Sequence, residues 1–220
     1  MATVQVLPSI VSAPLLDLQP ALAELYAAGI RTLHVDIEDG HFVPVMNLGT
    51  RLIAHLHGDG RFALDVHLMV SNPEEVIAWV AAAGASAISF HYEASAYPRR
   101  HLQMIRQHGL RAGLAFNPKT PWPALEYLAD CLDFVILLTS EPEEPDMPFL
   151  PQVLAKVEAA RRWAQHHAPH LAIVADGGID AATIAAAVQA GAGQVVAGRA
   201  VFAAGQISTN LAKLQKALHP

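Results

Sequence analysis

The chain has 220 residues, of which 53% are hydrophobic and 15% are charged; this composition excludes a disordered protein and allows a sizeable core. Its formal charge of −6 provides no basic surface for a phosphate backbone, which argues against nucleic-acid binding. The single cysteine, Cys131, cannot form an internal disulfide, and the first basic residue is Arg31. We therefore expect a cytoplasmic protein without a signal peptide. The uncharged stretch 181–198 is rich in Ala and Gly, and we interpret it as a helix and a strand rather than a membrane span.

Short, nearly continuous apolar runs recur along the chain and predict parallel strands that are buried on both faces. There are eight, at residues 4–10, 32–37, 62–69, 87–91, 111–116, 134–138, 171–176 and 194–197.

The segments between these runs are predicted to be helices. Asn72-Pro73 and Thr120-Pro121 each combine a capping residue with Pro at the first helical position, which indicates a helix start. A glycine also stands shortly before several of the predicted strands, as expected for glycine at a helix end. These glycines are Gly29, Gly84, Gly109 and Gly191. Eight such units predict a (β/α)₈ barrel, an α/β fold, and no linker divides residues 1–220, so we expect a single domain.

Functional sites of this architecture lie at the carboxyl ends of the strands. His34 and Asp36 end the second strand, and their i, i+2 spacing places both side chains on one face. Asp65 and His67 repeat this spacing in the third strand, and Asp176 ends the seventh. Imidazole and carboxylate together suit one divalent metal ion such as Zn, Mn or Fe. The alternative is a set of hydrogen-bonded polar residues at the barrel mouth, which is the better interpretation for any one of them alone.

Other polar residues carry weaker signals. His91 ends the fourth strand and could contact the substrate or a metal ligand, or be a satisfied polar residue. Five further histidines are predicted to be exposed: His55, His57, His166, His167 and His170. Gly177-Gly178 and Gly198-Arg199 follow the seventh and eighth strands, where this architecture commonly binds phosphate. Glycines there also serve simple tight turns.

Five segments resemble the ribulose-phosphate 3-epimerase family, and the resemblance runs in order from the first strand to the eighth, over nearly the whole chain. They are Pro8-Ser9-Ile10, residues 34–44, residues 65–70, Ala115-Phe116-Asn117-Pro118 and Asp176-Gly177-Gly178-Ile179. The resemblance implies a metal-dependent isomerase that epimerises C3 of a ketose and that is commonly a homo-oligomer.

The resemblance also implies roles for individual residues. His34, Asp36, His67 and Asp176 would bind the metal, and Asp36 and Asp176 would also be the catalytic acid and base, acting through an enediolate. Ser9 would contact the substrate, a sugar or sugar phosphate. Independently of the resemblance, we expect substrate contacts from His67 and, at the phosphate position of this architecture, from Gly177, Gly178, Gly198 and Arg199.

The sequence departs from the family after the sixth strand. The family has a glycine-rich phosphate loop there, whereas residues 141–147 carry four carboxylates, two prolines and no glycine. Prolines remove N–H donors, and the carboxylates would repel a phosphate. Glu38 and Val45 replace the Met and Asn that the family usually has, Leu138 replaces a further Met, and Arg199 replaces a small residue.

Three accounts of these departures are open. The one we favour from sequence is a ketose that lacks a terminal phosphate or bears a cationic group. The second is an ordinary D-ribulose 5-phosphate/D-xylulose 5-phosphate 3-epimerase, in which the acidic loop pairs with Arg199 and the glycines still hold phosphate. The third is a non-catalytic binding barrel, which the presence of both Asp36 and Asp176 argues against. A lyase that uses the same metal site is a further alternative, and the acidic segment could also be a simple solvated loop.

Overall fold

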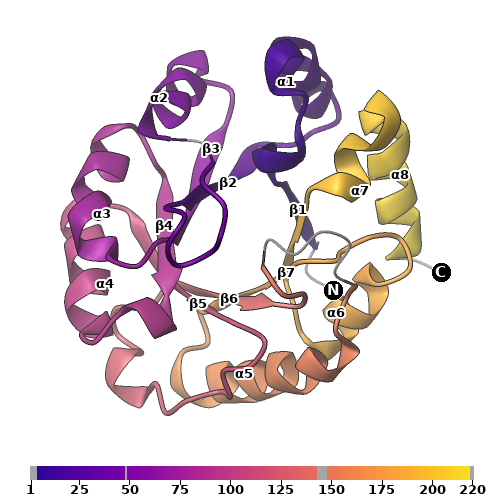
Figure 1. The fold of residues 1–220 in the computed structure, drawn as a ribbon. Coiled ribbons are helices and arrows are strands. Elements are labelled where there is room, and N and C mark those ends of the chain that lie inside the picture. Colours follow the sequence, from indigo (N-terminus) through magenta and orange to yellow (C-terminus); the bar gives the residue numbers. More distant parts are fainter. Residues whose placement is uncertain (1–3, 48, 143–147, 219–220) are drawn as a thin grey trace.

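The computed structural model describes residues 4–47, 49–142 and 148–218. Its eight parallel strands form one ring surrounded by helices, as Figure 1 shows. The strands are β1 (Gln5–Pro8), β2 (Thr32–Glu38), β3 (Ala63–Met69), β4 (Ala87–His91), β5 (Arg111–Phe116), β6 (Phe134–Leu138), β7 (Ala172–Asp176) and β8 (Gln194–Ala197). Each observed strand begins and ends within two residues of its predicted range, so the predicted (β/α)₈ barrel is confirmed.

The ring closes next to the candidate site. Continuous ladders run from β2 through β3 to β8 and on to β1. The last contact, between β1 and β2, is a single parallel bridge between Ser9 and His34. The β2–β3 ladder sets Asp36 opposite His67. This register brings a carboxylate and an imidazole from different strands to one level of the barrel.

Alternate residues of the strands pack into two apolar layers. One layer fills the inside of the barrel, with Leu7, Phe134, Ile136, Val174 and Val196 among its members. The larger layer lies between the strands and the surrounding helices. Because both faces of each strand are covered, the strands are apolar along nearly their whole length. The polar residues that interrupt them are therefore candidates for function.

The helices cover the outside of the ring. They are α1 (Leu18–Ala27), α2 (Thr50–Asp59), α3 (Pro73–Ala82), α4 (Pro98–Gln107), α5 (Leu154–His167), α6 (Ile184–Ala190), α7 (Arg199–Phe202) and α8 (Ile207–Ala217). Gly29, Gly84, Gly109 and Gly191 have φ between 75° and 126°, which confirms their prediction as left-handed helix ends. No helix within the described ranges is long and apolar enough to cross a membrane.

The prediction of a helix that starts at Thr120-Pro121 is wrong. Residues 117–133, all of them described, connect β5 to β6 with only a short 3₁₀ turn, Glu126–Leu128. The Lys156 ammonium group donates hydrogen bonds to the carbonyl oxygens of Asn117, Pro118 and Thr120. Those carbonyls are thus directed at a side chain of α5 rather than along a helix axis.

Candidate active site

The four predicted metal ligands come together at the mouth of the barrel. His34 and Asp36 come from β2, His67 from β3 and Asp176 from the end of β7, and one ligand atom of each lies within 4.8 Å of the others. His34 and His67 are fully buried, and Asp36 is 7% exposed. Strand alternation explains the arrangement, because residues i and i+2 of a strand point to the same side.

The two imidazole rings face the two carboxylates. His34 Nε2 lies 3.0 Å from Asp36 Oδ1 and 3.7 Å from Asp176 Oδ2. His67 Nδ1 lies 3.3 Å from Asp36 Oδ1 and 3.8 Å from Asp176 Oδ2. The two histidines therefore present different ring nitrogens to the same centre.

Asp65 lies behind His34. Its Oδ2 is 2.9 Å from His34 Nδ1, so an ionised Asp65 accepts the Nδ1–H hydrogen bond and leaves Nε2 directed at the centre. Burial would lower the pKa of His34, but the carboxylates of Asp36 and Asp65 outweigh it and raise that pKa well above its usual range. A cation is therefore favoured in this position, whether a proton or a metal ion.

The two central carboxyl groups differ in proton affinity. Burial would raise the pKa of Asp36, but His34 and His67 outweigh burial and hold that pKa well below its usual range. Burial raises the pKa of Asp176 to about 6, and the nearby Asp36 contributes to the increase. Two carboxyl groups whose pKa values are pushed apart in this way can act as a base and an acid.

The residues present fit a divalent metal ion. Among the described residues, His67 Nδ1 has no hydrogen-bond partner of good geometry, although it is fully buried and faces two carboxylates. A buried ring nitrogen in this setting is costly unless it binds a proton or a metal. Two imidazole nitrogens and two carboxylate oxygens are a donor set that Zn, Mn and Fe all accept.

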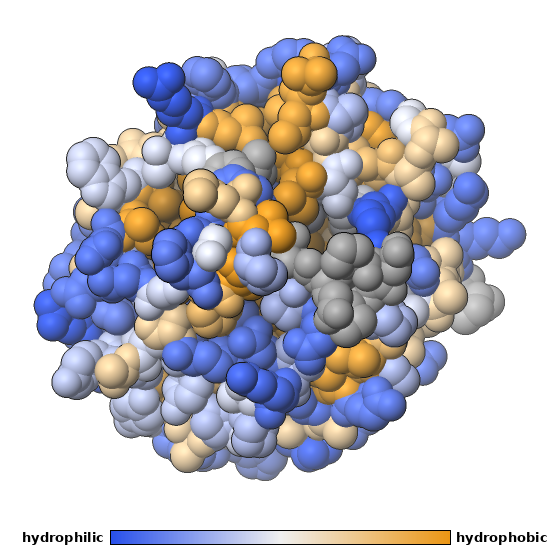
Figure 2. Space-filling model, in the orientation of Figure 1, coloured by the Kyte–Doolittle hydropathy of each residue, from blue (hydrophilic) through white to orange (hydrophobic). Residues whose placement is uncertain are grey.

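The centre opens into a cleft of about 1140 Å³ that is lined by most of the predicted substrate residues. Ser9, Gly177, Gly178, Gly198 and Arg199 all line it, together with Asp36 and Asp176. Figure 2 shows apolar side chains toward the middle of this face and hydrophilic ones around its edge. The Ser9 hydroxyl donates a 2.7 Å hydrogen bond to Asp36 Oδ2, so it also orients this carboxylate.

The backbone itself requires glycine at two cleft positions, Gly177 and Gly178, and a neighbouring side chain crowds a third, Gly198. Gly177 and Gly178 have φ of 103° and 66°, values that side-chain-bearing residues rarely adopt. A Cβ on Gly178 would lie within 3.0 Å of the Phe149 backbone, and one on Gly198 would lie 2.4 Å from the Ser12 hydroxyl. Tight packing therefore accounts for glycine here, and phosphate binding stays a prediction.

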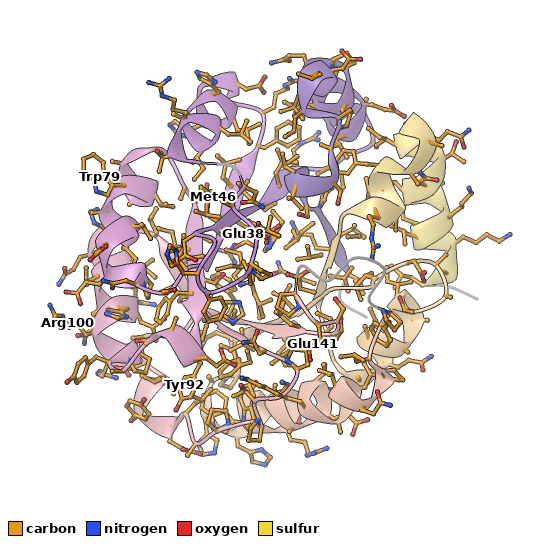
Figure 3. The ribbon with its side chains drawn as sticks, in the orientation of Figure 1. Glu38, Met46, Trp79, Tyr92, Arg100 and Glu141 are labelled. Atoms are coloured by element: carbon orange, nitrogen blue, oxygen red, sulfur yellow. The ribbon has the colours of Figure 1, made fainter. Side chains whose placement is uncertain are left out.

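Two acidic residues that depart from the family pattern, Glu38 and Glu141, differ in their surroundings. Glu38 is 3% exposed at the end of β2, and Glu141 lines the cleft. Figure 3 shows both toward the centre of the ring, whereas Trp79 and Arg100 lie on its outer edge. Residues 143–147, which include the rest of the acidic loop, lie outside the described residues.

The structure adds Glu93, which the sequence did not identify, and gives His91 the contact with a predicted metal ligand that the sequence left open. His91 Nε2 lies 3.0 Å from His67 Nε2, and His91 Nδ1 lies 3.3 Å from Glu93 Oε2. The only sequence signal for Glu93 is its i+2 spacing from His91. The five histidines predicted to be exposed are exposed.

Comparison with known proteins places this site in a family. The family model described as "Ribulose-phosphate 3 epimerase family" matches residues 5–202. The chain belongs to the ribulose-phosphate 3-epimerase family. It is 39% identical over 196 residues to the ribulose-phosphate 3-epimerase of Escherichia coli K12, covering 89% of this chain and 87% of that protein. The Bacillus subtilis 168 protein of the same name is 36% identical over 200 residues, covering 90% of this chain and 92% of its own.

Solved structures show the same fold at greater distance. The N-(5'-phosphoribosyl)anthranilate isomerase of Pyrococcus furiosus superposes with a TM-score of 0.63 at 11% identity, covering 98% of each chain. Family membership confirms the predicted fold and the predicted class of enzyme, an isomerase that acts on carbohydrates. Assembly into a homo-oligomer and a cytoplasmic location stay predictions.

Proposed function

We propose that the protein is a metal-dependent ketose 3-epimerase in which Asp36 and Asp176 exchange the proton of C3. The observation that carries the proposal is the convergence of these two carboxylates with His34 and His67 at the open end of the barrel. Membership in the ribulose-phosphate 3-epimerase family supports it. The same residues serve as metal ligands and as acid and base, so one centre accounts for the whole reaction.

The metal ion has a defined part in this proposal. When bound, a divalent ion supplies a Lewis acid that stabilises negative charge on the substrate oxygens while the C3 proton is absent. His34, Asp36, His67 and Asp176 would hold it, and their two nitrogen and two oxygen donors suit Zn, Mn or Fe.

Proton transfer is assigned to the two carboxyl groups. In one direction Asp36, whose pKa is well below the usual range, removes the C3 proton. Asp176, whose pKa is raised to about 6, delivers a proton to the opposite face of the same carbon. The bonding electrons remain on the substrate as an enediolate between the two transfers, and the roles exchange in the reverse direction. Ser9 orients Asp36 for this task through its hydrogen bond to Oδ2.

The described part of the cleft supports a phosphorylated ketose, and we infer D-ribulose 5-phosphate as the substrate. Arg199 lines the cleft beside Gly177, Gly178 and Gly198, and guanidinium and backbone N–H groups both bind phosphate well. Asp180, one of the acidic residues in the cleft, is engaged elsewhere, because its Oδ1 accepts hydrogen bonds from the backbone N–H groups of Ala182 and Thr183. The relatives named as ribulose-phosphate 3-epimerases support the same substrate.

A ketose without phosphate, or with a cationic group, is the second candidate. The observation in its favour is the replacement of the family's glycine loop by residues 141–147, four of which are acidic. Glu141 lies in the cleft itself, and an anionic rim would attract a cation and repel a phosphate.

Proton exchange in D₂O tests the proposal. The Zn²⁺- or Mn²⁺-loaded protein is incubated with ribulose 5-phosphate, with free ketoses and with amino-ketoses, and loss of the C3 proton signal is followed by NMR. We expect exchange with ribulose 5-phosphate that is abolished in Asp36→Asn and Asp176→Asn. Asp180→Asn, which changes a carboxylate of the same cleft outside the metal cluster, serves as the matched control and should retain activity.

The outcomes separate the alternatives. Exchange only with unphosphorylated or cationic ketoses would support the second candidate substrate. A new product of lower mass would indicate a lyase. If the metal-loaded protein exchanges no carbon-bound proton in any ketose, the protein is a binding barrel and the proposal is wrong.

A further inference from the structure

A chain of three side chains runs from the candidate metal centre to the outer rim of the barrel. His67 Nε2, on the side of the ring away from the centre, lies 3.0 Å from His91 Nε2. His91 Nδ1, on the far side of its own ring, lies 3.3 Å from Glu93 Oε2. Both histidines are fully buried, and Phe42 covers the His91 ring at a centroid distance of 4.4 Å. The hydrogen bond between the two histidines is thus shielded from water.

The far end of this chain is fixed as an acceptor. Glu93 Oε1 accepts hydrogen bonds from the Asn117 backbone N–H, at 2.8 Å, and from the Thr120 hydroxyl. Only 18% of the Glu93 side-chain surface is exposed. Burial would raise the pKa of Glu93, but hydrogen bonds from His91 and Thr120 outweigh it and lower that pKa to about 2. An ionised carboxylate has no proton to donate.

The direction of every hydrogen bond then follows. Because Glu93 can only accept, His91 carries its proton on Nδ1 and donates it to Glu93. A neutral imidazole carries one proton, so with that proton on Nδ1 the Nε2 of His91, which lies 3.0 Å from His67 Nε2, has a lone pair. That lone pair accepts a hydrogen bond from Nε2–H of His67. A neutral His67 protonated on Nε2 has its own lone pair on Nδ1, the atom that faces Asp36 and Asp176.

We propose that Glu93, acting through His91, is a positioning residue that fixes the Nε2–H tautomer of His67 and so directs the Nδ1 lone pair to the metal. This inference rests on the proposed metal site. It assigns a role to residues outside the four ligands, and it explains why this histidine uses Nδ1. Groups that orient a metal-bound imidazole in this way typically change metal affinity 10- to 100-fold when they are replaced.

The variant Glu93→Gln gives a sharp test because it should reverse the direction of the hydrogen bonds that link residue 93, His91 and His67. The amide oxygen is expected to remain where Oε1 accepts from Asn117 and Thr120, which turns the NH₂ group toward His91 Nδ1. His91 must then accept on Nδ1, carry its proton on Nε2 and donate to His67. His67 is left with a proton on Nδ1, where the metal should bind.

A matched control exists on another face of the molecule. Glu74 Oε2 lies 3.3 Å from Nε2 of the buried His101, which is the same distance as in the Glu93–His91 pair. Glu74→Gln therefore makes the same chemical change beside a buried histidine that is outside the candidate site.

Two measurements decide the inference. Zn²⁺ affinity is measured by competition with a chromophoric chelator, and ¹⁵N NMR at pH 8 identifies which ring nitrogen of His67 and His91 carries the proton. We expect Zn²⁺ binding about 10- to 100-fold weaker in Glu93→Gln and less than about twofold changed in Glu74→Gln. In the wild-type protein we expect His91 protonated on Nδ1 and His67 on Nε2, and this reading requires no variant to fold.

The outcomes are distinct from those of the proposed function. Wild-type protein that binds neither Zn²⁺ nor Mn²⁺ overturns the proposed metal site and this inference with it. Wild-type protein that binds Zn²⁺ while Glu93→Gln binds it equally well overturns the inference alone. A His91 proton found on Nε2 in the wild-type protein overturns it as well.

Discussion

Gly178 lies where the end of β7 turns toward the cleft, and replacing it with alanine tests how tightly this turn is built. Its φ is 66°, in the left-handed region. A Cβ there would lie 2.8 Å from the Cα and 2.9 Å from the backbone nitrogen of Phe149. Carbon atoms in van der Waals contact are normally about 3.5–4.0 Å apart, and backbone atoms cannot rotate out of the way as a side-chain end can.

The expected cost is the sum of two effects. An alanine forced into the left-handed region loses about 1–2 kcal/mol relative to glycine. Displacing the backbone near Phe149 adds about 1–3 kcal/mol, as overpacking in a filled site commonly does. We expect Gly178→Ala to lower the free energy of unfolding by about 2–5 kcal/mol, which corresponds to a melting temperature roughly 4–20 °C lower for a chain of this size.

Urea and thermal unfolding, followed by circular dichroism, measure this cost. Gly193→Ala is the matched control, since it precedes β8, has no positive φ and would place its Cβ in open space; it should change stability by less than about 1 kcal/mol. If Gly178→Ala proves as stable as Gly193→Ala, the turn is not packed as described, and the argument that glycine is required there for structure is wrong.

Three further changes test other parts of the molecule by unfolding in urea. Asp39 accepts hydrogen bonds from three backbone N–H groups, which outweigh burial and lower its pKa from 3.8 to about 2. Its stabilisation is therefore present above about pH 4 and is lost as the pH falls toward 2. Asp39→Asn should cost about 1–2 kcal/mol at pH 7, after allowance for solvent screening, and the difference from wild type should shrink between about pH 4 and pH 2. Lys156→Met removes three hydrogen bonds to carbonyl groups, but it also removes the cost of burying an ammonium group, a burial that lowers the pKa of Lys156 to about 8. Because three charge-assisted hydrogen bonds outweigh that cost, we expect the free energy of unfolding to fall by about 2–3 kcal/mol. A smaller fall than in the exposed control Lys213→Met would contradict this prediction. Gly113→Ala places a Cβ 2.5 Å from the buried Phe134 ring, so it should cost about 1–3 kcal/mol, and the double variant with Phe134→Leu should recover part of that loss.

The strands could be predicted almost residue by residue, whereas one helix could not. A strand buried on both faces has an apolar sequence throughout, and this local signal does not depend on the rest of the chain. The start signals Asn72-Pro73 and Thr120-Pro121 both combine a capping residue with Pro, but only the first begins a helix, α3. Asn72-Pro73 is followed by Glu74 and Glu75 in the first turn, whereas Thr120-Pro121 is followed by a second proline, Pro123, which disfavours helical backbone at the residue before it. In the folded chain Lys156, 36 residues beyond Thr120, stabilises this non-helical path by donating a hydrogen bond to the Thr120 carbonyl oxygen, a contact that the local sequence does not contain.

The candidate site divides in the same way. Asp36 and His67 could be paired from sequence because strand alternation and the βα repeat determine which side chains share the mouth of the barrel. The importance of Glu93 could not, because its partners come from the β5–β6 connection, at Asn117 and Thr120. These residues hold Glu93 through contacts that only the folded chain creates.

Which nitrogen each histidine offers is also decided by contacts beyond the four ligands. His34 has a carboxylate, Asp65, on its Nδ1 and presents Nε2 to the centre. His67 has its acceptor on Nε2 and presents Nδ1. The sequence does not distinguish these two cases, because either ring nitrogen of a histidine can bind a metal. His34 and His67 therefore present opposite nitrogens because the fold places their acceptors differently. The carboxylate of Asp65, on β3, contacts the His34 ring directly, whereas the carboxylate of Glu93 acts on the His67 ring through the imidazole of His91.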